Sequence, residues 1–300
     1  MLKKSLLILL ALVLLDLLAG FLLRKLYFSQ KSNPLYRTTY TLHKVNKELI
    51  VLGSSRANHH YSDSVLSTDL QKTYYNGGID GEFFLYSYAM LHGITKRYKP
   101  SLVIIDVNPD ALSKRVYNSS SSAKLRPYYR EDRFYLNMAG RFDAYEKIKA
   151  VSTIFPFNGK LFSMIYGNLR TDPTDTIGYF PLYGSKDSAV FFNRKAAKTV
   201  QNDPRLELMF EECINMAGKN NIKLVILISP LYEYRVQDDA SVNKMKELCA
   251  KYNTPLLDFG HSINFAGKKE LFYDIDHLNN EGAIRFSKEL AQKLKELKLL

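Results

Sequence analysis

The chain has 300 residues, of which 46% are apolar and 24% are charged, so it is long enough for a large folded domain and is too apolar to be a disordered protein. Its formal net charge is +12, which suits an anionic lipid surface or an anionic polymer as a partner, although a solvated basic surface explains this charge without any partner. We do not expect nucleic acid as a partner, because the lysines are scattered and no nucleic-acid-binding motif is present.

The first thirty residues (1–30) predict a membrane anchor. Residues 5–23 are almost wholly apolar, with basic residues on both sides, and at about 1.5 Å per residue they match the hydrocarbon core of a bilayer. A cleaved signal peptide is the alternative, because Leu18-Ala19-Gly20 is an acceptable small-residue cleavage site. The apolar run continues past this site to Leu23, which favours an uncleaved anchor.

One acidic residue, Asp16, lies inside the apolar segment, where insertion of an aspartate costs about 2.5 to 3.5 kcal/mol. Either it faces a partner helix, or a single aspartate is tolerated in a leucine-rich helix. The basic flanks are balanced, so the charge rule does not fix the orientation. A short N-terminal tail inside and a domain outside is the commoner arrangement, and we therefore expect the domain outside the membrane. Residues 31–46 read as a polar connector.

The stretch from Glu48 to His60 predicts a buried strand followed by a turn that could carry chemistry. Leu49–Leu52 is a short apolar run of the kind found in buried parallel strands, and Gly53-Ser54-Ser55 follows at once. Functional residues of open α/β sheets collect at the carboxyl ends of the strands, where a nucleophile would lie. An ordinary strand-to-helix turn with a serine cap is the alternative.

The turn is followed by three candidates for contact with a substrate, which are Arg56, His59 and His60. Capping, surface positions, or pairing of Arg56 with a structural carboxylate are alternatives that the sequence leaves open. A metal site is not expected here, because the side chains of adjacent histidines diverge and the spacing of ligands is poor.

The middle of the chain continues the α/β pattern and then interrupts it. A strand over Lys72–Tyr75 ends at Asn76-Gly77-Gly78, where paired glycines allow either a plain turn or the close backbone approach that an oxyanion hole requires. A helix over 81–98 and a strand over Leu102–Val107 follow. Residues 111–200 are rich in Tyr and Phe, and we interpret them as a partly helical insertion whose aromatic residues bind a sugar or lipid or simply pack together.

The α/β pattern returns at Asp203. Helices are predicted over 206–217 and 242–252, strands over 223–228 and 255–258, and a final helix buries Ala283, Phe286, Leu290, Leu294 and Leu297. Alternation of this kind predicts an α/β fold, a three-layer α/β/α sandwich with a parallel sheet. The two cysteines, Cys213 and Cys249, lie in predicted helices, where we expect them to pack as small apolar residues; a disulfide cannot be assigned from sequence.

The last motif, Asp274-Ile275-Asp276-His277, precedes the final helix. Its spacing lets the carboxylate of Asp274 reach the imidazole of His277. A serine hydroxyl is a poor nucleophile until a base takes its proton, and the base works best when a carboxylate fixes its tautomer. Ser55, His277 and Asp274 therefore make a candidate catalytic triad.

The order of these residues resembles that of the SGNH (GDSL-like) hydrolases, over about residues 47–300. Gly53-Ser54-Ser55 resembles the first block, with Ser54 where many members have Asp, and Asn76-Gly77-Gly78 resembles the second. The third block falls at Asp106–Asp110 without its usual glycine and trailing aspartate, whereas Asp274 to His277 matches the last block in full. The resemblance implies a flavodoxin-like fold, no cofactor or metal, and an oxyanion hole made by Ser55, Gly77, Gly78 and Asn108.

The His-Leu-Asn sequence at the start of the last helix is similar to one branch of that family, which includes the D-alanyl transfer protein of teichoic acids and the alginate acetylation proteins. This resemblance implies acyl transfer or ester hydrolysis on a cell-surface polysaccharide or wall polymer, beside a membrane-bound O-acyltransferase. Two other functions stay open. One is a non-catalytic carbohydrate-binding or assembly factor, and the other is a membrane-tethered lipolytic esterase.

Overall fold

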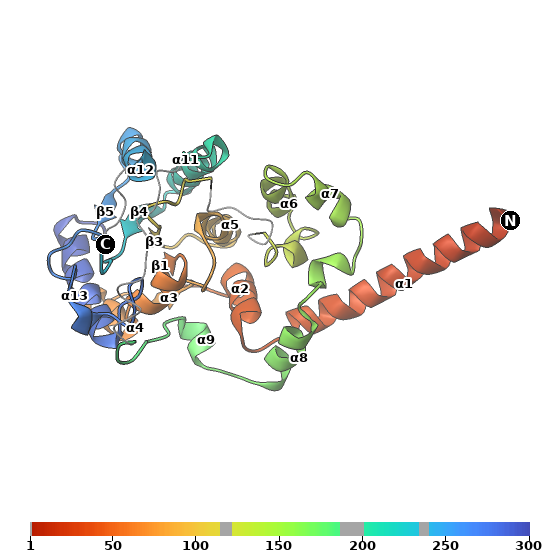
Figure 1. Cartoon of the computed structure of the whole chain (residues 1–300), viewed down its shortest axis with the longest axis horizontal. Helices are drawn as coiled ribbons and strands as arrows, with labels where there is room; N and C mark the ends of the chain where they lie inside the picture. Colours follow the sequence, from red (N-terminus) through yellow and green to blue (C-terminus); the bar gives the residue numbers. More distant parts are fainter. Residues whose placement is uncertain (1, 115–121, 187–200, 234–239) are drawn as a thin grey trace. The chain divides into compact units, whose positions relative to one another are not determined.

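The computed structural model describes residues 2–114, 122–186, 201–233 and 240–300 (Figure 1). The chain divides into two compact units. Unit 1 comprises Met1–Thr39 and Tyr117–Asp175, and unit 2 comprises Tyr40–Val116 and Thr176–Leu300. The expected insertion at 111–200 is thus shared between the two units, and its residues 115–121 and 187–200 lie outside the described part of the chain.

Unit 2 contains a five-stranded parallel sheet with the strand order β2-β1-β3-β4-β5. The strands are β1 (Leu49–Leu52), β2 (Tyr74–Asn76), β3 (Leu102–Asp106), β4 (Lys223–Ile228) and β5 (Leu256–Asp258). The prediction of a parallel sheet is confirmed, and the bounds of β1 and β4 are those predicted. Their apolar runs are continuous because both faces of the sheet are covered.

Two layers of helices cover this sheet (Figure 1). One layer holds α3 (Ser55–His60), α4 (Asp63–Leu70) and α13 (Asn280–Glu296), and the other holds α5 (Phe84–Thr95), α11 (Pro204–Lys219) and α12 (Ala240–Lys251). Alternate strand residues, such as Leu49 and Val51, pack with Phe286 and Leu290 of α13 in one apolar core. The three-layer α/β/α fold predicted from the sequence is therefore confirmed.

The end of the final helix and the two cysteines test further details of the sequence prediction. Leu297, expected in the buried stripe of the final helix, lies just after α13 and is 41% exposed. Cys213 and Cys249 are free and buried, as expected for small apolar residues, and burial raises the pKa of the Cys249 thiol to about 12. A short helix, η3 (Lys269–Leu271), precedes the Asp274 motif.

Unit 1 is built from short helices around the second half of the apolar N-terminal helix α1 (Leu2–Phe28). The others are η1 (Arg126–Tyr128), α6 (Arg133–Gly140), α7 (Tyr145–Lys149), η2 (Phe155–Phe157) and α8 (Leu161–Leu169). Two more helices, α2 (Pro34–His43) and α9 (Thr174–Ile177), run from one unit into the other. The sequence does not predict α2, which lies in the expected connector.

The first half of α1 is exposed, whereas its end packs against other segments of unit 1. Of the described residues, α1 is the one helix long and apolar enough to cross a membrane. Tyr27 is fully buried, with its hydroxyl 3.3 Å from that of Tyr128, and Arg24 forms an ion pair of 2.6 Å with Glu131. The end of α1 is therefore fixed by a buried aromatic side chain and by an ion pair.

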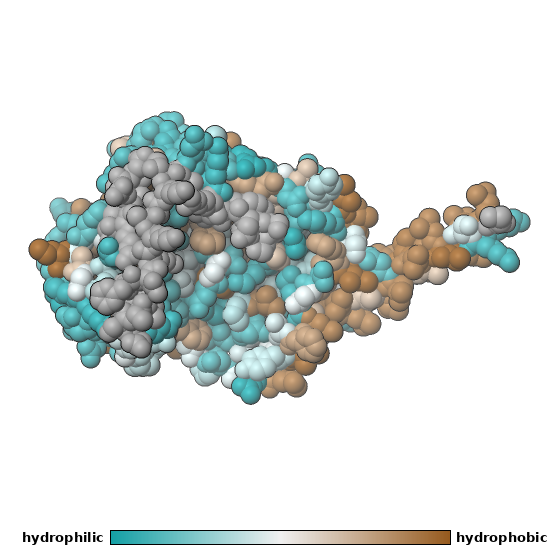
Figure 2. Space-filling model, viewed as in Figure 1, coloured by the Kyte–Doolittle hydropathy of each residue, from teal (hydrophilic) through white to brown (hydrophobic). Residues whose placement is uncertain are grey.

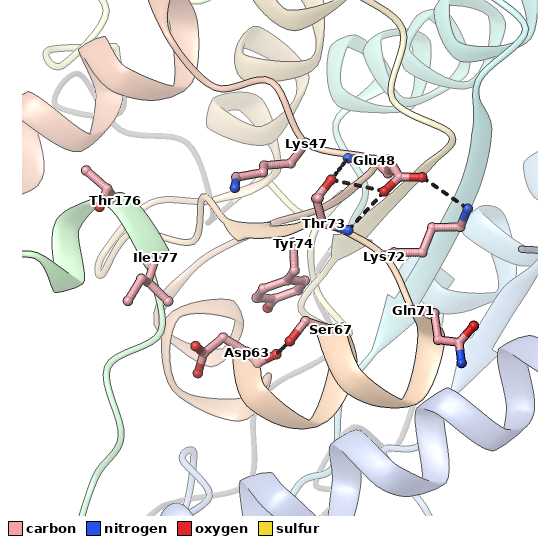
Figure 3. Close-up of a pocket in the computed structure, with 10 residues that line it drawn as sticks. All are labelled: Lys47, Glu48, Asp63, Ser67, Gln71, Lys72, Thr73, Tyr74, Thr176 and Ile177. Carbon is pink, nitrogen blue, oxygen red and sulfur yellow. Dashed lines mark hydrogen bonds and ion pairs between the residues drawn. The ribbon is translucent and has the colours of Figure 1, made fainter.

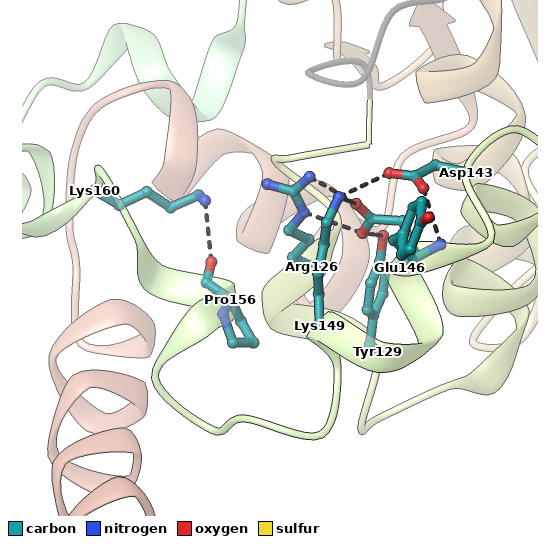
Figure 4. Close-up of polar contacts among 8 residues, drawn as sticks. Arg126, Tyr129, Asp143, Glu146, Lys149, Pro156 and Lys160 are labelled. Atoms are coloured by element: carbon teal, nitrogen blue, oxygen red, sulfur yellow. Dashed lines mark hydrogen bonds and ion pairs between the residues drawn. The ribbon is translucent and has the colours of Figure 1, made fainter.

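A buried carboxylate joins α7 to η1 within unit 1 (Figure 4). Glu146 accepts two hydrogen bonds from the guanidinium of Arg126, at 2.7 and 3.1 Å, and one of 2.9 Å from the hydroxyl of Tyr129. Lys149 binds both Glu146 and Asp143. A paired arginine and carboxylate of this geometry holds the two segments in a fixed register.

Candidate active site

The predicted nucleophile, Ser55, is the first residue of α3 and lies just beyond the carboxyl end of β1. A Cβ atom on Gly53 would lie 2.7 Å from the Cβ of Ala57 and 2.9 Å from the carbonyl oxygen of Asp106, so glycine lets the chain turn close against β3. Ser54 occupies the N-cap position, but its side chain makes no capping hydrogen bond. The simple serine cap considered above is therefore not what the turn provides.

The structure brings Ser55, His277 and Asp274 together in one row of hydrogen bonds. Nε2 of His277 lies 2.8 Å from Oγ of Ser55, and Nδ1 of His277 lies 2.8 Å from Oδ1 of Asp274. A proton on Nδ1 donates to the carboxylate, which leaves the lone pair of Nε2 directed at the serine hydroxyl. The row spans 222 residues of sequence between Ser55 and His277.

Asp274 is held as a carboxylate by several donors. Its Oδ1 also accepts the N–H groups of Asp276 and His277, both at 3.0 Å, and its Oδ2 lies 3.2 Å from the ammonium of Lys186. Burial alone would raise the pKa of Asp274, but the hydrogen bond and charge of His277, with these other donors, hold the pKa well below its ordinary value. Asp274 is therefore ionised at neutral pH and fixes the tautomer of His277.

His60 lies behind His277 and holds the backbone next to it. Its Nε2 accepts the N–H of Leu278 at 3.0 Å, so its Nδ1 carries the proton and donates to Oγ of Ser229 at 3.1 Å. The side chain is completely buried, and burial, together with the nearby charges of His277 and Arg56, lowers the pKa of His60 well below its ordinary value. His60 is thus a neutral, structural residue, and the expectation that it contacts substrate is not supported.

Arg56 has a structural role as well. Its guanidinium lies 2.5 Å from the carbonyl oxygen of Val107 and 3.4 Å from the carboxylate of Asp106, and its side chain is almost fully buried. Tyr61 and Ser229 also donate to Asp106, whose pKa is raised by burial against the opposing effect of these donors. Of the two alternatives for Arg56, pairing with a structural carboxylate is the one that the geometry supports.

His59 is the candidate substrate contact that lies beside the row of three. Its ring meets the ring of His277 edge-on, with centroids 5.6 Å apart. Nδ1 lies 2.6 Å from the carbonyl oxygen of Phe180, and Nε2 lies 3.3 Å from the carboxylate of Asp80. Burial would raise the pKa of Asp80, but the contact with His59 lowers this pKa to about 2. Contact of His59 with a substrate stays a prediction.

The N–H groups of the two glycines expected in the oxyanion hole already donate hydrogen bonds within the fold. The N–H of Gly77 bonds to the carbonyl oxygen of Val51 at 2.7 Å, and that of Gly78 bonds to Oδ1 of Asn76 at 2.9 Å. A Cβ atom on Gly78 would lie 2.5 Å from the backbone nitrogen of Asn58, so this glycine permits close packing against α3. The geometry therefore speaks against Gly77 and Gly78 as oxyanion donors.

The other two expected oxyanion donors, the N–H of Ser55 and the side-chain amide of Asn108, are not used in hydrogen bonds between described residues. The N–H of Ser55, at the first position of α3, has no acceptor among the described residues, as is usual for the start of a helix. Within the described ranges, the side-chain amide of Asn108 likewise has no hydrogen-bond partner. Leu52 of β1 pairs with Ile105 of β3, so Ser55 and Asn108 follow neighbouring strand ends. Their role as oxyanion donors stays a prediction.

A separate pocket of about 510 Å³ lies at the opposite end of the strands (Figure 3). Its lining includes Glu48, just before β1, which accepts hydrogen bonds from Thr73 and an ion pair from Lys72, just before β2. These positions mark the amino ends of the strands, whereas Ser55 lies beyond a carboxyl end. The pocket is thus distinct from the candidate active site.

No family model and no curated protein matches this chain. Among solved structures, it is similar to a protein of Bacteroides fragilis assigned as an acylhydrolase, with 12% identity, 90% of this chain and 100% of that chain covered, and a TM-score of 0.46. It is also similar to a GDSL-like lipase from Bacteroides thetaiotaomicron, with 12% identity, 87% and 99% covered, and a TM-score of 0.40. An acetyl xylan esterase matches with 12% identity, 83% and 98% covered, and a TM-score of 0.40.

Proposed function

We propose that this chain is a membrane-anchored serine enzyme that hydrolyses or transfers an acyl ester. The observation that carries the proposal is the row of two 2.8 Å contacts, from Ser55 to Nε2 of His277 and from Nδ1 of His277 to Asp274. The ionised Asp274 fixes the tautomer in which Nε2 accepts the serine proton. Nucleophilic attack by serine requires this tautomer, in which Nε2 of His277 faces the hydroxyl of Ser55.

The reaction follows from these positions. Oγ of Ser55 attacks the acyl carbonyl while its proton passes to Nε2 of His277, and the imidazolium gives that proton to the departing alcohol oxygen. The product is an acyl ester on Ser55. A water molecule or an acceptor hydroxyl then loses its proton to Nε2 and attacks the ester carbonyl. The bond from the acyl carbon to Oγ of Ser55 breaks, and the imidazolium returns the proton to Oγ. Water gives hydrolysis and a polymer hydroxyl gives acyl transfer.

The oxyanion of each tetrahedral intermediate needs hydrogen-bond donors. The N–H of Ser55 and the amide of Asn108 are the uncommitted groups that we assign to this role. One such donor stabilises the transition state by about 2.7 to 4 kcal/mol. Gly77 and Gly78 are not assigned to it, because their N–H groups are used within the fold.

The resemblance of these residues to SGNH hydrolases supports the reaction class, and its branch supports a cell-surface polysaccharide or wall polymer as the substrate. We therefore propose O-acetylation or deacetylation in the cell envelope, with the domain outside the membrane and a membrane-bound O-acyltransferase as partner. Retention of the anchor is supported by Asp16, which lies before the alternative cleavage site at Leu18-Ala19-Gly20 and is bonded to Ser152 and Thr153 of unit 1.

The test uses the full-length protein in detergent with a short-chain aryl acetate. We expect turnover by the unchanged protein and its loss in Ser55→Ala and His277→Ala. Ser54→Ala is the matched control. It removes the hydroxyl of the preceding residue, and the side chain of Ser54 makes no capping hydrogen bond. Turnover that survives in Ser55→Ala while the protein remains folded would contradict the proposal.

The chain length of the ester separates the proposed enzyme from the lipolytic alternative. We expect acetyl esters to be turned over faster than esters of long-chain acids, whereas a lipolytic esterase would prefer the long chains. A folded protein that turns over no ester, and whose Ser55→Ala variant still supports polymer modification in cells, would instead indicate a binding or assembly factor.

A further inference from the structure

Unit 1 exposes a large apolar surface beside α1. Nine apolar residues between positions 145 and 169 are exposed, which is unusual for a segment this short in a soluble protein. We call them the 145–169 surface: Tyr145, Ile148, Val151, Ile154, Leu161, Phe162, Ile165, Tyr166 and Leu169. Figure 2 shows apolar colour running from α1 onto the surface of the unit at its base.

The position of this surface along α1 is fixed by Asp16. Its carboxylate accepts hydrogen bonds of 2.6 Å from the hydroxyl of Ser152 and 2.6 Å from the N–H of Thr153. A third, of 3.4 Å, comes from the N–H of Ile154. Asp16 therefore bonds to a loop of its own chain, neither facing a partner helix nor left unsatisfied in a leucine-rich helix. These bonds place residues 152–154 level with the middle of the apolar segment.

One face of α1 continues this contact toward its end. Asp16, Gly20, Arg24 and Tyr27 recur every three or four residues and lie on the same side of the helix. A Cβ atom on Gly20 would overlap the side chain of Thr153, so the loop approaches the helix as closely as glycine permits. Close contacts of small residues with a helix backbone are typical of packing within a membrane.

Helix geometry gives the depth of the loop at 152–154, whereas α8 lies beside the end of α1, where the side-chain amide of Asn168 donates to the carbonyl oxygen of Leu26 at 2.9 Å. Seven residues separate Asp16 from Leu23, the end of the apolar segment, which corresponds to about 10 Å along the helix axis. If residues 5–23 cross the hydrocarbon core, the loop at 152–154 lies about 10 Å below its edge. Interfacial segments are typically buried by about 5 to 10 Å, so the loop has the depth of such a segment.

The residues around the 145–169 surface suit the boundary of a bilayer. Tyr145 and Tyr166 carry a hydroxyl on an apolar ring, a combination enriched at the level of lipid headgroups. Lys147 and Arg170 are exposed beside them, and Lys25 lies just after the apolar segment. Exposed cations beside an apolar surface attract anionic headgroups.

We propose that the 145–169 surface is embedded in the outer half of the same bilayer that α1 crosses, with lipid acyl chains as its partner. The proposal rests on the membrane anchor of the proposed function. It makes α1 and the 145–169 surface a single membrane-bound element, with Asp16 shielded from lipid by Ser152 and Thr153. Unit 1 is then the part of the chain that inserts.

The test exploits the absence of tryptophan from the chain. A single tryptophan is introduced as Phe162→Trp into the full-length protein, which is reconstituted in vesicles of phosphatidylcholine and phosphatidylglycerol with bromine atoms on the acyl chains. Bromine quenches tryptophan on contact. We expect Phe162→Trp to be quenched relative to vesicles without bromine and to emit at shorter wavelength than in water.

Two matched variants separate this proposal from the anchor itself. Leu10→Trp, in the exposed first half of α1, reports insertion of the anchor and should be quenched. Ile263→Trp, in unit 2, has the same 86% exposure as Phe162 and should not be quenched. Quenching of Leu10→Trp without quenching of Phe162→Trp would overturn the embedded surface and would point to a protein partner for it. Absence of quenching in both would contradict the anchor as well.

Discussion

Two aspartates, one in each unit, accept several hydrogen bonds, but from different kinds of donor. Asp274 in unit 2 faces the imidazole of His277 and the ammonium of Lys186, both of which carry or can acquire positive charge. Asp16 in unit 1 is bonded within the described residues to a serine hydroxyl and to backbone N–H groups, all of them neutral. Asp274 can therefore control which nitrogen of His277 carries the proton, whereas Asp16 fixes the position of a loop.

The sharpest use of this comparison is to make the same substitution at both positions. In Asp274→Asn, the amide presents an N–H that favours the opposite tautomer of His277, whose Nε2 then no longer accepts the proton of Ser55. We expect the rate of ester turnover to fall by on the order of 10⁴-fold, with the protein still folded. Steady-state kinetics of the purified full-length protein measure this, and a loss of less than tenfold would contradict the role of Asp274.

At Asp16 the same change should do little, because the amide oxygen of Asn can accept the N–H of Thr153 while its NH2 group donates to the hydroxyl of Ser152, and only the 3.4 Å bond from Ile154 is lost. Asp16→Leu is the disruptive variant, since it leaves the N–H of Thr153 without its acceptor. Loss of hydrogen bonds to a charged group costs about 1.5 to 3 kcal/mol. Hydrogen exchange at Thr153 in detergent should speed up in Asp16→Leu and change little in Asp16→Asn. Equal protection in both variants would show that the carboxylate does not hold the loop.

A third prediction concerns the pH dependence of unit 2. The folded state keeps His60 neutral, because burial lowers the pKa of His60 below the ordinary value of 6.5, whereas the unfolded chain binds a proton there at about pH 6.5. The free energy of unfolding should therefore fall as the pH drops below about 6.5. Denaturation between about pH 5 and pH 7.5 should show a smaller slope in His60→Asn. His261→Asn, at an exposed histidine of the same unit, is the control and should keep the original slope.

The smallest effect is expected for Lys186, whose ammonium contacts the outer oxygen of Asp274. Its side chain is 45% exposed, and exposed ion pairs contribute only about 0 to 1 kcal/mol. Lys186→Met should therefore slow ester turnover by less than about fivefold. A loss as large as that of Asp274→Asn would mean that Lys186 takes part in the reaction itself.

The parts of this structure that follow from local pattern could be predicted from the sequence. The apolar runs of β1 and β4 give their bounds, and the three-residue spacing of Asp274 and His277 gives their contact. Pairing of Ser55 with His277 joins residues far apart in the chain, and it was suggested by the need of a serine for a base and by the resemblance to a known family rather than by a local pattern.

Contacts made across long sequence distances, with no local signature, could not be predicted. The partners of Asp16 lie 136 to 138 residues away, so the sequence shows only an aspartate in an apolar run. The bond from Leu278 to His60 spans 218 residues, and without it His60 looks like a substrate contact. A pair of glycines likewise shows that the backbone can come close to something, but not whether its N–H groups are already used.

The most direct test of the central claim is to find which serine reacts with a fluorophosphonate, a reagent that labels activated serines. The full-length protein is labelled, digested with trypsin, and the peptide that ends at Arg56, which contains both Ser54 and Ser55, is fragmented in a mass spectrometer. We predict the label on Ser55, its loss in His277→Ala, and its retention in Ser54→Ala. Label on Ser54, or label on Ser55 that persists in His277→Ala, would contradict activation of Ser55 by His277.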